Sequence, residues 1–245
     1  MEYTYLLVNF FTILIPFTFS FHPKLKFHKT WRAFFPAVVF TGFIFIVWDM
    51  LFTAMGVWGF NDRYLTGLKV GNLPLEEVLF FFCIPYACVF TFHCLSLFLP
   101  KRVNIRRQKN ISVFLATVLL VVGILNIQNL YTASTFLSLA VLIILSHFVW
   151  NIYWLTRFYI VYLVLLIPFF IVNGILTGTG IEEEVVWYNP EEFLNLRLLT
   201  IPVEDIFYGM ELILMNLLIY KFLLNRKVET ASHQRKKEVS KKVIS

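Results

Sequence analysis

The chain has 245 residues, of which 59% are apolar and 15% are charged, and its mean hydropathy is +0.74. Soluble proteins average about 25% charged residues, so these values exclude an ordinary soluble domain and indicate a chain whose solvent is lipid. The odd number of cysteines, all within one apolar run (Cys83, Cys88 and Cys94), excludes a disulfide scaffold, and the net charge of +6 does not indicate nucleic-acid binding because the charges fall between apolar segments.

Seven apolar runs are long enough to cross a bilayer, which takes roughly 17 to 25 residues of helix. They cover residues 3–21, 33–54, 75–99, 111–128, 132–150, 158–176 and 201–224. The sequence therefore predicts an all-α, polytopic membrane protein with seven transmembrane helices. Glu2 rather than a basic region precedes the first run, so we expect a retained anchor and no cleaved signal peptide.

Basic residues are distributed unevenly between the connections of these runs. Of the 21 Lys and Arg residues, 18 fall in the first, third and fifth connections and in the tail, whereas Arg63, Lys69 and Arg197 fall in the others. By the positive-inside rule this distribution places the N-terminus outside and the C-terminus inside. The basic tail, 226–245, is predicted to be disordered and to lie against anionic lipid headgroups.

The chain also matches itself when its second half is laid over its first half at one constant offset. Segment 73–77, LPLEE, aligns with 201–205, IPVED, and at the same offset Asn61 aligns with Asn189. This pattern predicts two three-helix repeats, 1–100 and 131–225, joined by a linker with the fourth helix, 101–130. An odd linker helix makes the repeats parallel and relates them by an axis along the membrane normal, so both acidic motifs would lie on the outer side of one central cavity.

Two acidic pairs follow the prolines that mark the starts of the third and seventh helices: Glu76 with Glu77, and Glu204 with Asp205. Such acids can simply cap a helix and complement its positive end. Asp49 and Glu211, however, lie inside predicted spans, where ionisable residues are costly and usually functional. Crowded carboxyl groups with few cations cannot all ionise, so we expect a site that holds both a proton donor and a carboxylate base.

Aromatic residues surround these motifs, and although most such residues serve packing or the membrane interface, some are predicted to line a tunnel for a long apolar substrate. The lining candidates are Trp58, Phe60, Phe80, Phe81, Trp187, Tyr188, Phe207 and Tyr208. His93 and His147 lack a second ligand at metal spacing, so no metal site is expected. The sequence has no GxGxxG, phosphate-loop or CxxC motif, so no bound cofactor is expected either.

These motifs resemble those of the membrane-integral lycopene cyclases, the bacterial heterodimeric, archaeal fused and fungal bifunctional type. The residues that carry the resemblance are Trp48-Asp49, Gly56-Val57-Trp58-Gly59-Phe60-Asn61, Tyr64-Leu65-Thr66-Gly67, Asn72-Leu73-Pro74-Leu75-Glu76-Glu77, Ile201-Pro202-Val203-Glu204-Asp205 and Met215-Asn216-Leu217. The resemblance extends over both repeats and is closest to the fused form, in which both homologous subunits lie in one polypeptide.

The resemblance implies that acyclic ends of lycopene are closed to β-rings, through γ-carotene to β-carotene, in an isomerisation without a cofactor. An acid would protonate the terminal double bond, the C5–C6 double bond would attack the cation, and a base would remove the C6 proton. We assign these steps to the four paired acids, with tuning or orienting roles for the remaining polar residues: Asp49, Glu211, Asn61 and Asn189. The implied partners are lycopene or a related acyclic carotenoid, the bilayer and other carotenoid-pathway enzymes, in the cell membrane of a prokaryote.

Other function classes also use seven spans. A proton-coupled carrier of a small or lipophilic substrate would use intramembrane acids, but more often shows Gly- or Pro-broken helices near the bilayer midplane. A retinal-binding photoreceptor needs a lysine in the middle of the last span, whereas Lys221 lies at its inner end. A non-catalytic member of a carotenoid-synthesising complex is a third class; a cyclase half would show one acidic motif, and this chain has two.

Overall fold

The structure, a computed structural model, describes residues 3–99 and 104–244, with side chains up to Arg226. It confirms the all-α prediction, since the strands of the described part are only two or three residues long. The described helices are α1 (Thr4–Phe19), α2 (Trp31–Met55), α3 (Leu75–Phe98), α4 (Ile105–Leu125), α5 (Leu130–Ile144), α6 (Leu155–Leu176) and α7 (Val203–Ile244). Short 3-10 helices at Phe27–Thr30 and Asp62–Tyr64 and a π-helical turn at Leu145–Val149 complete the helical part.

Six helices in the described part of the chain are long and apolar enough to cross a membrane, so the chain is a multi-pass membrane protein. Helix α1 is shorter, with 16 residues or about 24 Å of length. It ends before the predicted residue 21 because the chain turns after Phe19, where the Ser20 hydroxyl donates to the carbonyl of Pro16 at 2.7 Å. A seventh span and the orientation in the membrane stay predictions.

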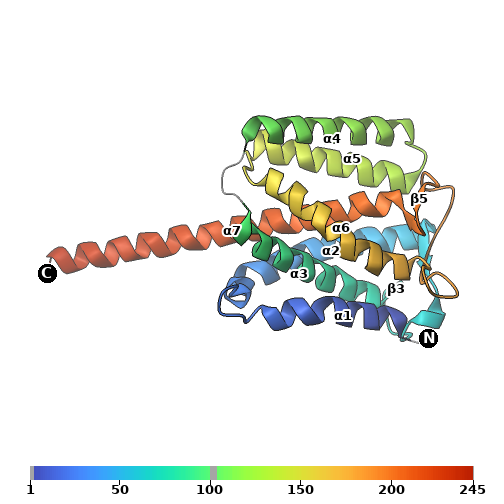
Figure 1. Cartoon of the computed structure of the whole chain (residues 1–245), viewed down its shortest axis with the longest axis horizontal. Coiled ribbons are helices and arrows are strands. Elements are labelled where there is room, and N and C mark those ends of the chain that lie inside the picture. The colour runs from blue at the N-terminus through green and yellow to red at the C-terminus, as the bar shows by residue number, and fades with distance from the viewer. Residues whose placement is uncertain (1–2, 100–103, 245) are drawn as a thin grey trace.

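The connections between helices are divided between the two ends of the bundle. Figure 1 shows the strands and the N-terminus at one end, whereas α1, α3 and α5 finish at the other end, where α7 leaves the bundle. Successive connections thus lie at alternate ends of the bundle, and the predicted orientation depends on this alternation. Helix α7 continues to Ile244 beyond the bundle (Figure 1), but side chains after Arg226 lie outside the described residues, so disorder and headgroup contact of the tail stay predictions.

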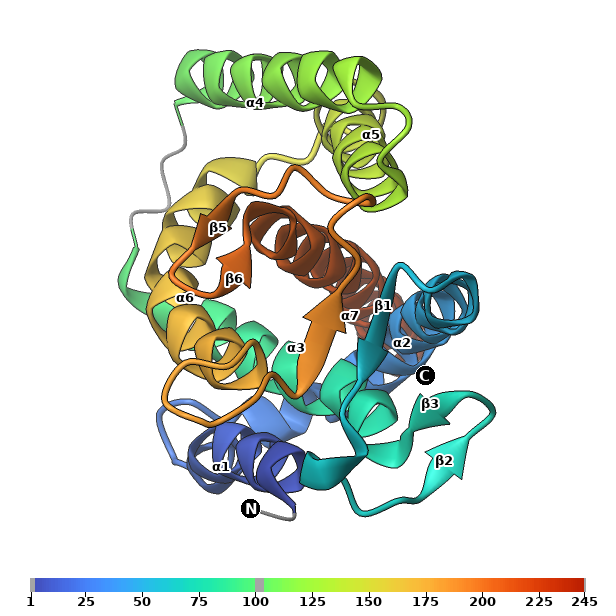
Figure 2. The ribbon, with the colours of Figure 1, turned by 90° about the vertical axis from the view of Figure 1, so that its right-hand side faces the viewer.

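The helices pack around a core between α3, α5, α6 and α7. Val89, Leu139, Phe158 and Leu214, one from each of these helices, are all buried. Viewed from the strand end, α4 lies outermost against α5, and α1 lies at the opposite edge of the bundle (Figure 2). This arrangement leaves α1, α3, α6 and α7 around the cavity described below.

The sequence repeat recurs in the backbone. The strands of the first half are β1 (Trp58–Phe60), β2 (Lys69–Val70) and β3 (Leu73–Pro74), and those of the second are β4 (Val186–Tyr188), β5 (Arg197–Leu198) and β6 (Ile201–Pro202). In each half a two-residue antiparallel hairpin, β2–β3 or β5–β6, leads directly into a long helix. Helices α3 and α7 begin directly after Pro74 and Pro202, so each proline ends its hairpin instead of opening the helix.

The two halves meet where β1 pairs with β4 in antiparallel register. Gly59 lies opposite Trp187 at the centre, and on either side the backbone N–H groups of Asn61 and Asn189 donate to Val185 and Val57, each at 2.9 Å. Asn189 is the repeat counterpart of Asn61, and Val185 is the repeat counterpart of Val57. The two hydrogen bonds are therefore equivalent, and the pairing is symmetric about its centre. The division into two parallel repeats related by an axis along the membrane normal stays a prediction.

Gly59 is required at this crossing because a Cβ there would lie 2.3 Å from Cζ2 of Trp187. We expect Gly59→Val to separate the two strands or displace the indole, at a cost of about 1 to 3 kcal/mol. The measurement is the thermal midpoint of the detergent-solubilised protein. Gly42→Ala is the matched control, because a Cβ at Gly42 meets its neighbours at 3.7 Å or more, an ordinary contact distance. Equal midpoints for both variants would contradict the role of Gly59.

Candidate active site

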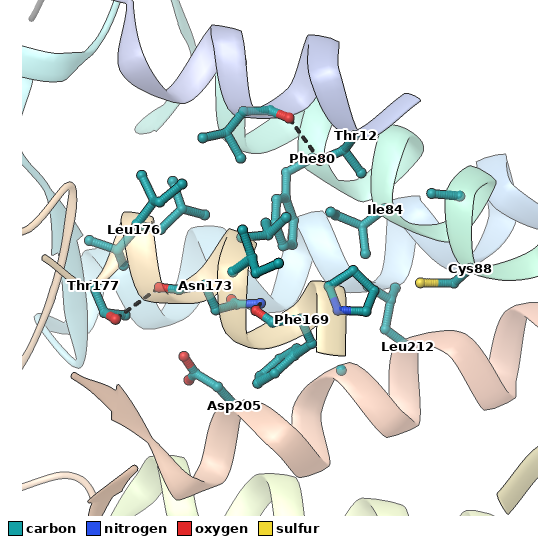
Figure 3. Close-up of a pocket in the computed structure, with 18 of the residues that line it drawn as sticks. Thr12, Phe80, Ile84, Cys88, Phe169, Asn173, Leu176, Thr177, Asp205 and Leu212 are labelled. Atoms are coloured by element: carbon teal, nitrogen blue, oxygen red, sulfur yellow. Dashed lines mark hydrogen bonds between the residues drawn. The ribbon is translucent and has the colours of Figure 1, made fainter. Parts of the chain in front are cut away.

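An elongated cavity of about 770 Å³ lies between α1, α3, α6 and α7. Its walls are mostly aliphatic and aromatic side chains from these helices. Figure 3 shows Asp205 and Thr177 toward one end of the cavity and Cys88 toward the other. Its volume lies within the range of pockets that bind small organic molecules, roughly 300 to 1,000 Å³.

Three carboxyl groups line the end of the cavity that lies beneath the strands. Asp49 comes from α2, Glu77 from the first turn of α3 and Asp205 from the first turn of α7. Their exposed fractions are only 1%, 8% and 5%. Glu77 and Asp205 occupy equivalent positions in the two repeats, so both acidic motifs contribute one residue to the same cavity.

The other acid of each pair does not line the cavity. Glu76 Oε1 accepts the backbone N–H of Thr66 at 2.6 Å, and Glu204 Oε1 accepts the backbone N–H of Leu194 at 2.8 Å. Glu204 Oε1 also accepts the hydroxyl of Thr132 at 2.6 Å. Both acids are fully buried, and each ties the loop before its hairpin to the start of its helix.

Helical geometry explains this division. Consecutive residues of a helix point about 100° apart, so neighbouring acids cannot face the same side. Since each hairpin folds back over the helix that follows it, the first acid faces the loop and the second faces the cavity. The four paired acids are thus near one another, but only Glu77 and Asp205 reach the space in which a substrate could lie.

Tyrosines bind both of these cavity acids. The hydroxyl of Tyr5 donates to Glu77 Oε2. The hydroxyls of Tyr131 and Tyr188 donate to Asp205 Oδ1 at 2.5 Å and to Oδ2 at 2.9 Å. Burial raises the pKa of Tyr188, which lies on β4 outside the helices, well above its usual range, and so favours its neutral, proton-donating form.

Asp49 is held differently from the other two acids. Its Oδ1 accepts the indole N–H of Trp58 and, at 3.4 Å, the hydroxyl of Thr53. Its Oδ2 is buried and has no hydrogen-bond partner among the described residues. Asn173 corresponds to it in the second repeat and also lines the cavity. Asp49 therefore lies with Glu77 and Asp205 along the cavity, and its predicted tuning role stays a prediction.

The predicted supporting residues Asn61, Asn189 and Glu211 have other partners than the cavity acids. The side-chain carbonyls of Asn61 and Asn189 accept the backbone N–H groups of Arg63 and Glu191, each at 3.1 Å, and so form turns beside the β1–β4 crossing. Glu211 is buried between α7 and α5, where it accepts the hydroxyl of Ser138 at 2.7 Å. None of the three lines the cavity.

The predicted aromatic lining is divided in the same way. Five of the eight candidates line the cavity: Trp58, Phe60, Phe80, Tyr188 and Tyr208. Phe81 is buried in a separate cluster with Phe45, Phe207 packs against Phe136 with ring centroids 4.8 Å apart, and Trp187 is 43% exposed.

The sequence pattern did not single out two residues that bind the cavity acids, Tyr5 and Tyr131. They lie near the starts of equivalent helices, α1 and α5. The offset that aligns the repeats places the counterpart of Tyr5 at position 133, close to Tyr131, so the internal repeat could have identified the pair.

Among the described residues, the ion pairs of the cations at this end of the molecule are made with loop acids and not with the cavity acids. Arg63 pairs with Glu182 at 2.5 Å, Lys69 with Asp62 at 3.5 Å and Arg197 with Glu184 at 3.9 Å. The hydrogen bond with Glu182 raises the pKa of Arg63 above its usual value. The hydrogen bonds that the described residues make to the cavity acids thus come from neutral donors, the tyrosines, Thr53 and Trp58.

Comparison of the sequence with known protein families finds a match to one family model. The family model for lycopene cyclase matches the chain in two stretches, 2–95 and 128–223, which together cover more than half of it. These stretches coincide with the two repeats and include all the acids described above. Searches of curated proteins and of solved structures returned no match.

Proposed function

The chain belongs to the lycopene cyclase family, and on this premise we propose that it closes the acyclic ends of lycopene to β-rings, giving β-carotene through the monocyclic γ-carotene. The observation that carries the proposal is that both repeats direct one acid, Glu77 or Asp205, into a single apolar cavity. One polypeptide would therefore be a complete isomerase that works on one end of its substrate at a time.

The reaction needs one proton donor and one proton acceptor. A proton added to C2 of the terminal double bond makes a tertiary cation at C1. The C5–C6 double bond attacks C1, the C1–C6 bond forms, and the charge moves to C5. Loss of the C6 proton then forms the ring double bond, so that atoms and electrons balance without an oxidant or reductant.

The acid and the base are drawn from Glu77, Asp205 and Asp49, which line the cavity. Glu76 and Glu204 act as positioning residues, because their bonds to Thr66 and Leu194 set the hairpins over the helix starts. Aromatic faces near the acids, such as those of Trp58 and Tyr208, can stabilise the cation through their π electrons.

The form of the cavity suits a long apolar substrate that comes from the bilayer. On α3 the lining extends from Glu77 to Thr91, about 21 Å along the helix axis. Phe11 and Ile15 of α1 and Ile171 of α6 line the cavity although they are 63%, 65% and 63% exposed. The cavity thus reaches the lipid-facing surface between α1 and α6, from which one end of a carotenoid can reach the acids.

We expect expression of the chain in bacteria that accumulate lycopene to convert the pigment to β-carotene, with γ-carotene as the intermediate. Chromatography of extracted pigments measures the conversion, and an immunoblot of the membrane fraction shows that the protein is present. The same host with an empty vector is the control. Unchanged lycopene beside abundant membrane protein would contradict the proposal and favour another carotenoid substrate, a missing partner or a carrier.

The same measurement bears on location and partners. Conversion by this chain in a bacterial membrane would support the cell membrane of a prokaryote as its site of action. It would also mean that the proposed association with other carotenoid-pathway enzymes is not needed for catalysis.

A further inference from the structure

The two repeats hold their cavity acids unequally. Asp205 accepts one tyrosine hydroxyl on each of its oxygens, from Tyr131 and Tyr188, whereas Glu77 accepts, among the described residues, a hydroxyl only on Oε2, from Tyr5. The difference follows from the sequence, because the counterpart of Tyr188 in the first repeat is Phe60, which has no hydroxyl.

The tyrosines that bind Asp205 are themselves held in place. Their rings stack with centroids 5.9 Å apart and planes 13° apart. Tyr131 is buried against Trp58, with centroids 5.0 Å apart, and Tyr188 lies on β4 opposite Trp58 of β1. The strand crossing thus fixes both hydroxyls, which define where the two oxygens of Asp205 lie.

Resting on the function proposed above, we propose that Tyr131 and Tyr188 are positioning residues that hold Asp205 as the base and so decide which ring double bond forms, with Glu77 as the proton donor.

Carbocation chemistry explains why the base must be held in position. The cyclised cation, with its charge at C5, can lose a proton from C6, from C4 or from the methyl group on C5, and each loss gives a different ring alkene. A proton beside a cationic carbon is strongly acidic, so a weak base suffices and the location of that base decides the product. A carboxylate whose two oxygens accept hydrogen bonds from two fixed donors is a weak base, but its position relative to the substrate is well defined.

Glu77 suits the opposite task. Tyr5 is its only hydrogen-bonding partner among the described residues, so Oε1 makes no such bond, and Glu77 keeps more exposed surface than Asp205, 8% against 5%. Protonation of an alkene needs a carboxylic O–H that is directed at carbon and is not already donated elsewhere. Glu77 Oε1 can carry that proton into the cavity, and Asp205 receives one from C6 in each cycle. The net return of a proton from Asp205 to Glu77 between cycles restores the acid and the base.

The test is the distribution of ring isomers formed by tyrosine variants. We expect wild type to form one ring alkene as its main product with the other two as minor products. Tyr131→Phe combined with Tyr188→Phe should raise the combined fraction of these minor products by about tenfold, the effect expected from the loss of two hydrogen bonds. In each single variant, the fraction of the minor ring alkenes should lie between the values for wild type and for the double variant. Chromatography with absorption and mass spectra resolves the isomers from lycopene-accumulating cells.

Two matched variants separate positioning from general damage. Tyr86→Phe removes another buried tyrosine hydroxyl, which is 2.6 Å from Ser20 Oγ; Tyr86 does not line the cavity, so the isomer ratio of this variant should equal that of wild type. Tyr5→Phe removes the donor to Glu77 and should lower the rate without changing the ratio. A double tyrosine variant that only lowers the yield, at a constant ratio, overturns the proposal.

If the double variant is absent from the membrane, Asp205→Glu provides the second test. Its carboxylate keeps the charge but is displaced by one methylene, so a changed isomer ratio supports the proposal and an unchanged ratio overturns it. The wild-type sample distinguishes failure of the proposed cyclase function from failure of the proposed positioning by Tyr131 and Tyr188. No cyclisation by wild type contradicts the proposed function itself, whereas normal cyclisation with invariant ratios contradicts only the tyrosine positioning.

Discussion

Glu77→Gln and Asp205→Asn are each expected to lower the rate of cyclisation by about 100- to 10,000-fold, the usual contribution of a general acid or base. Each substitution is nearly isosteric and keeps an oxygen that can accept a tyrosine hydroxyl, so the cavity should keep its shape. The amide can neither donate a carboxylic proton nor accept one from carbon. The measurement is the rate of ring formation in isolated membranes supplied with lycopene, normalised to the amount of cyclase.

Glu211→Gln is the matched control for these two variants. It replaces another buried carboxyl of α7, one that binds Ser138 and does not line the cavity. Its activity should therefore fall far less than that of Asp205→Asn. Full activity of Glu77→Gln or of Asp205→Asn would show that the proton is handled elsewhere, with Asp49 as the next candidate.

At Glu204 and Glu76, we expect the activity and stability of a variant to depend on the size and hydrogen bonding of the new side chain more than on its charge. Glutamine keeps a carbonyl oxygen for the backbone N–H of Leu194 or Thr66, so Glu204→Gln and Glu76→Gln should keep much of the activity. Alanine leaves these donors unpaired, at a cost of about 1 to 3 kcal/mol for each. Glu204→Ala should be the worse of the two because Thr132 also loses its acceptor.

The thermal midpoint and the rate of ring formation together test this distinction. Loop anchoring predicts that both quantities fall in the alanine variants and that both are largely retained in the glutamine variants. A folded Glu204→Gln protein as inactive as Asp205→Asn would instead place Glu204 in the chemistry, as the sequence pattern alone suggests. The same comparison applies to Glu76 and Glu77.

The helical spans could be predicted because hydropathy is a local property of about twenty residues. Their ends were less accurate where polar residues extend a helix. The fourth run was predicted to begin at residue 111, but α4 begins at Ile105, where Asn104 accepts the backbone N–H of Arg107 at 3.0 Å. The seventh run was predicted to begin at residue 201, but Ile201 and Pro202 form β6.

The positions of single side chains were predicted less well than the motifs that contain them, and the roles of these residues stay predictions. Asn61 and Asn189 were expected to orient the acids, but their side chains form turns beside the strand crossing. Trp187 was expected to line a tunnel, but its neighbour Tyr188 points to Asp205 because side chains alternate along a strand. In both cases the residue lies near the site, and the direction of its side chain depends on strand pairing.

The sequence by itself determined that the chain is a membrane protein and that its acidic motif occurs twice at one constant offset. It also determined which family the chain resembles. All three are properties of short segments and of the spacing between them. Only the tertiary structure decided which acid of each pair meets the cavity. Neighbouring helical residues point about 100° apart, and the rotation of a helix is set by the elements that pack against it. The tyrosines that bind Glu77 and Asp205 from α1 and α5 lie 72 and 74 residues away in sequence, on helices whose positions only the folded chain defines.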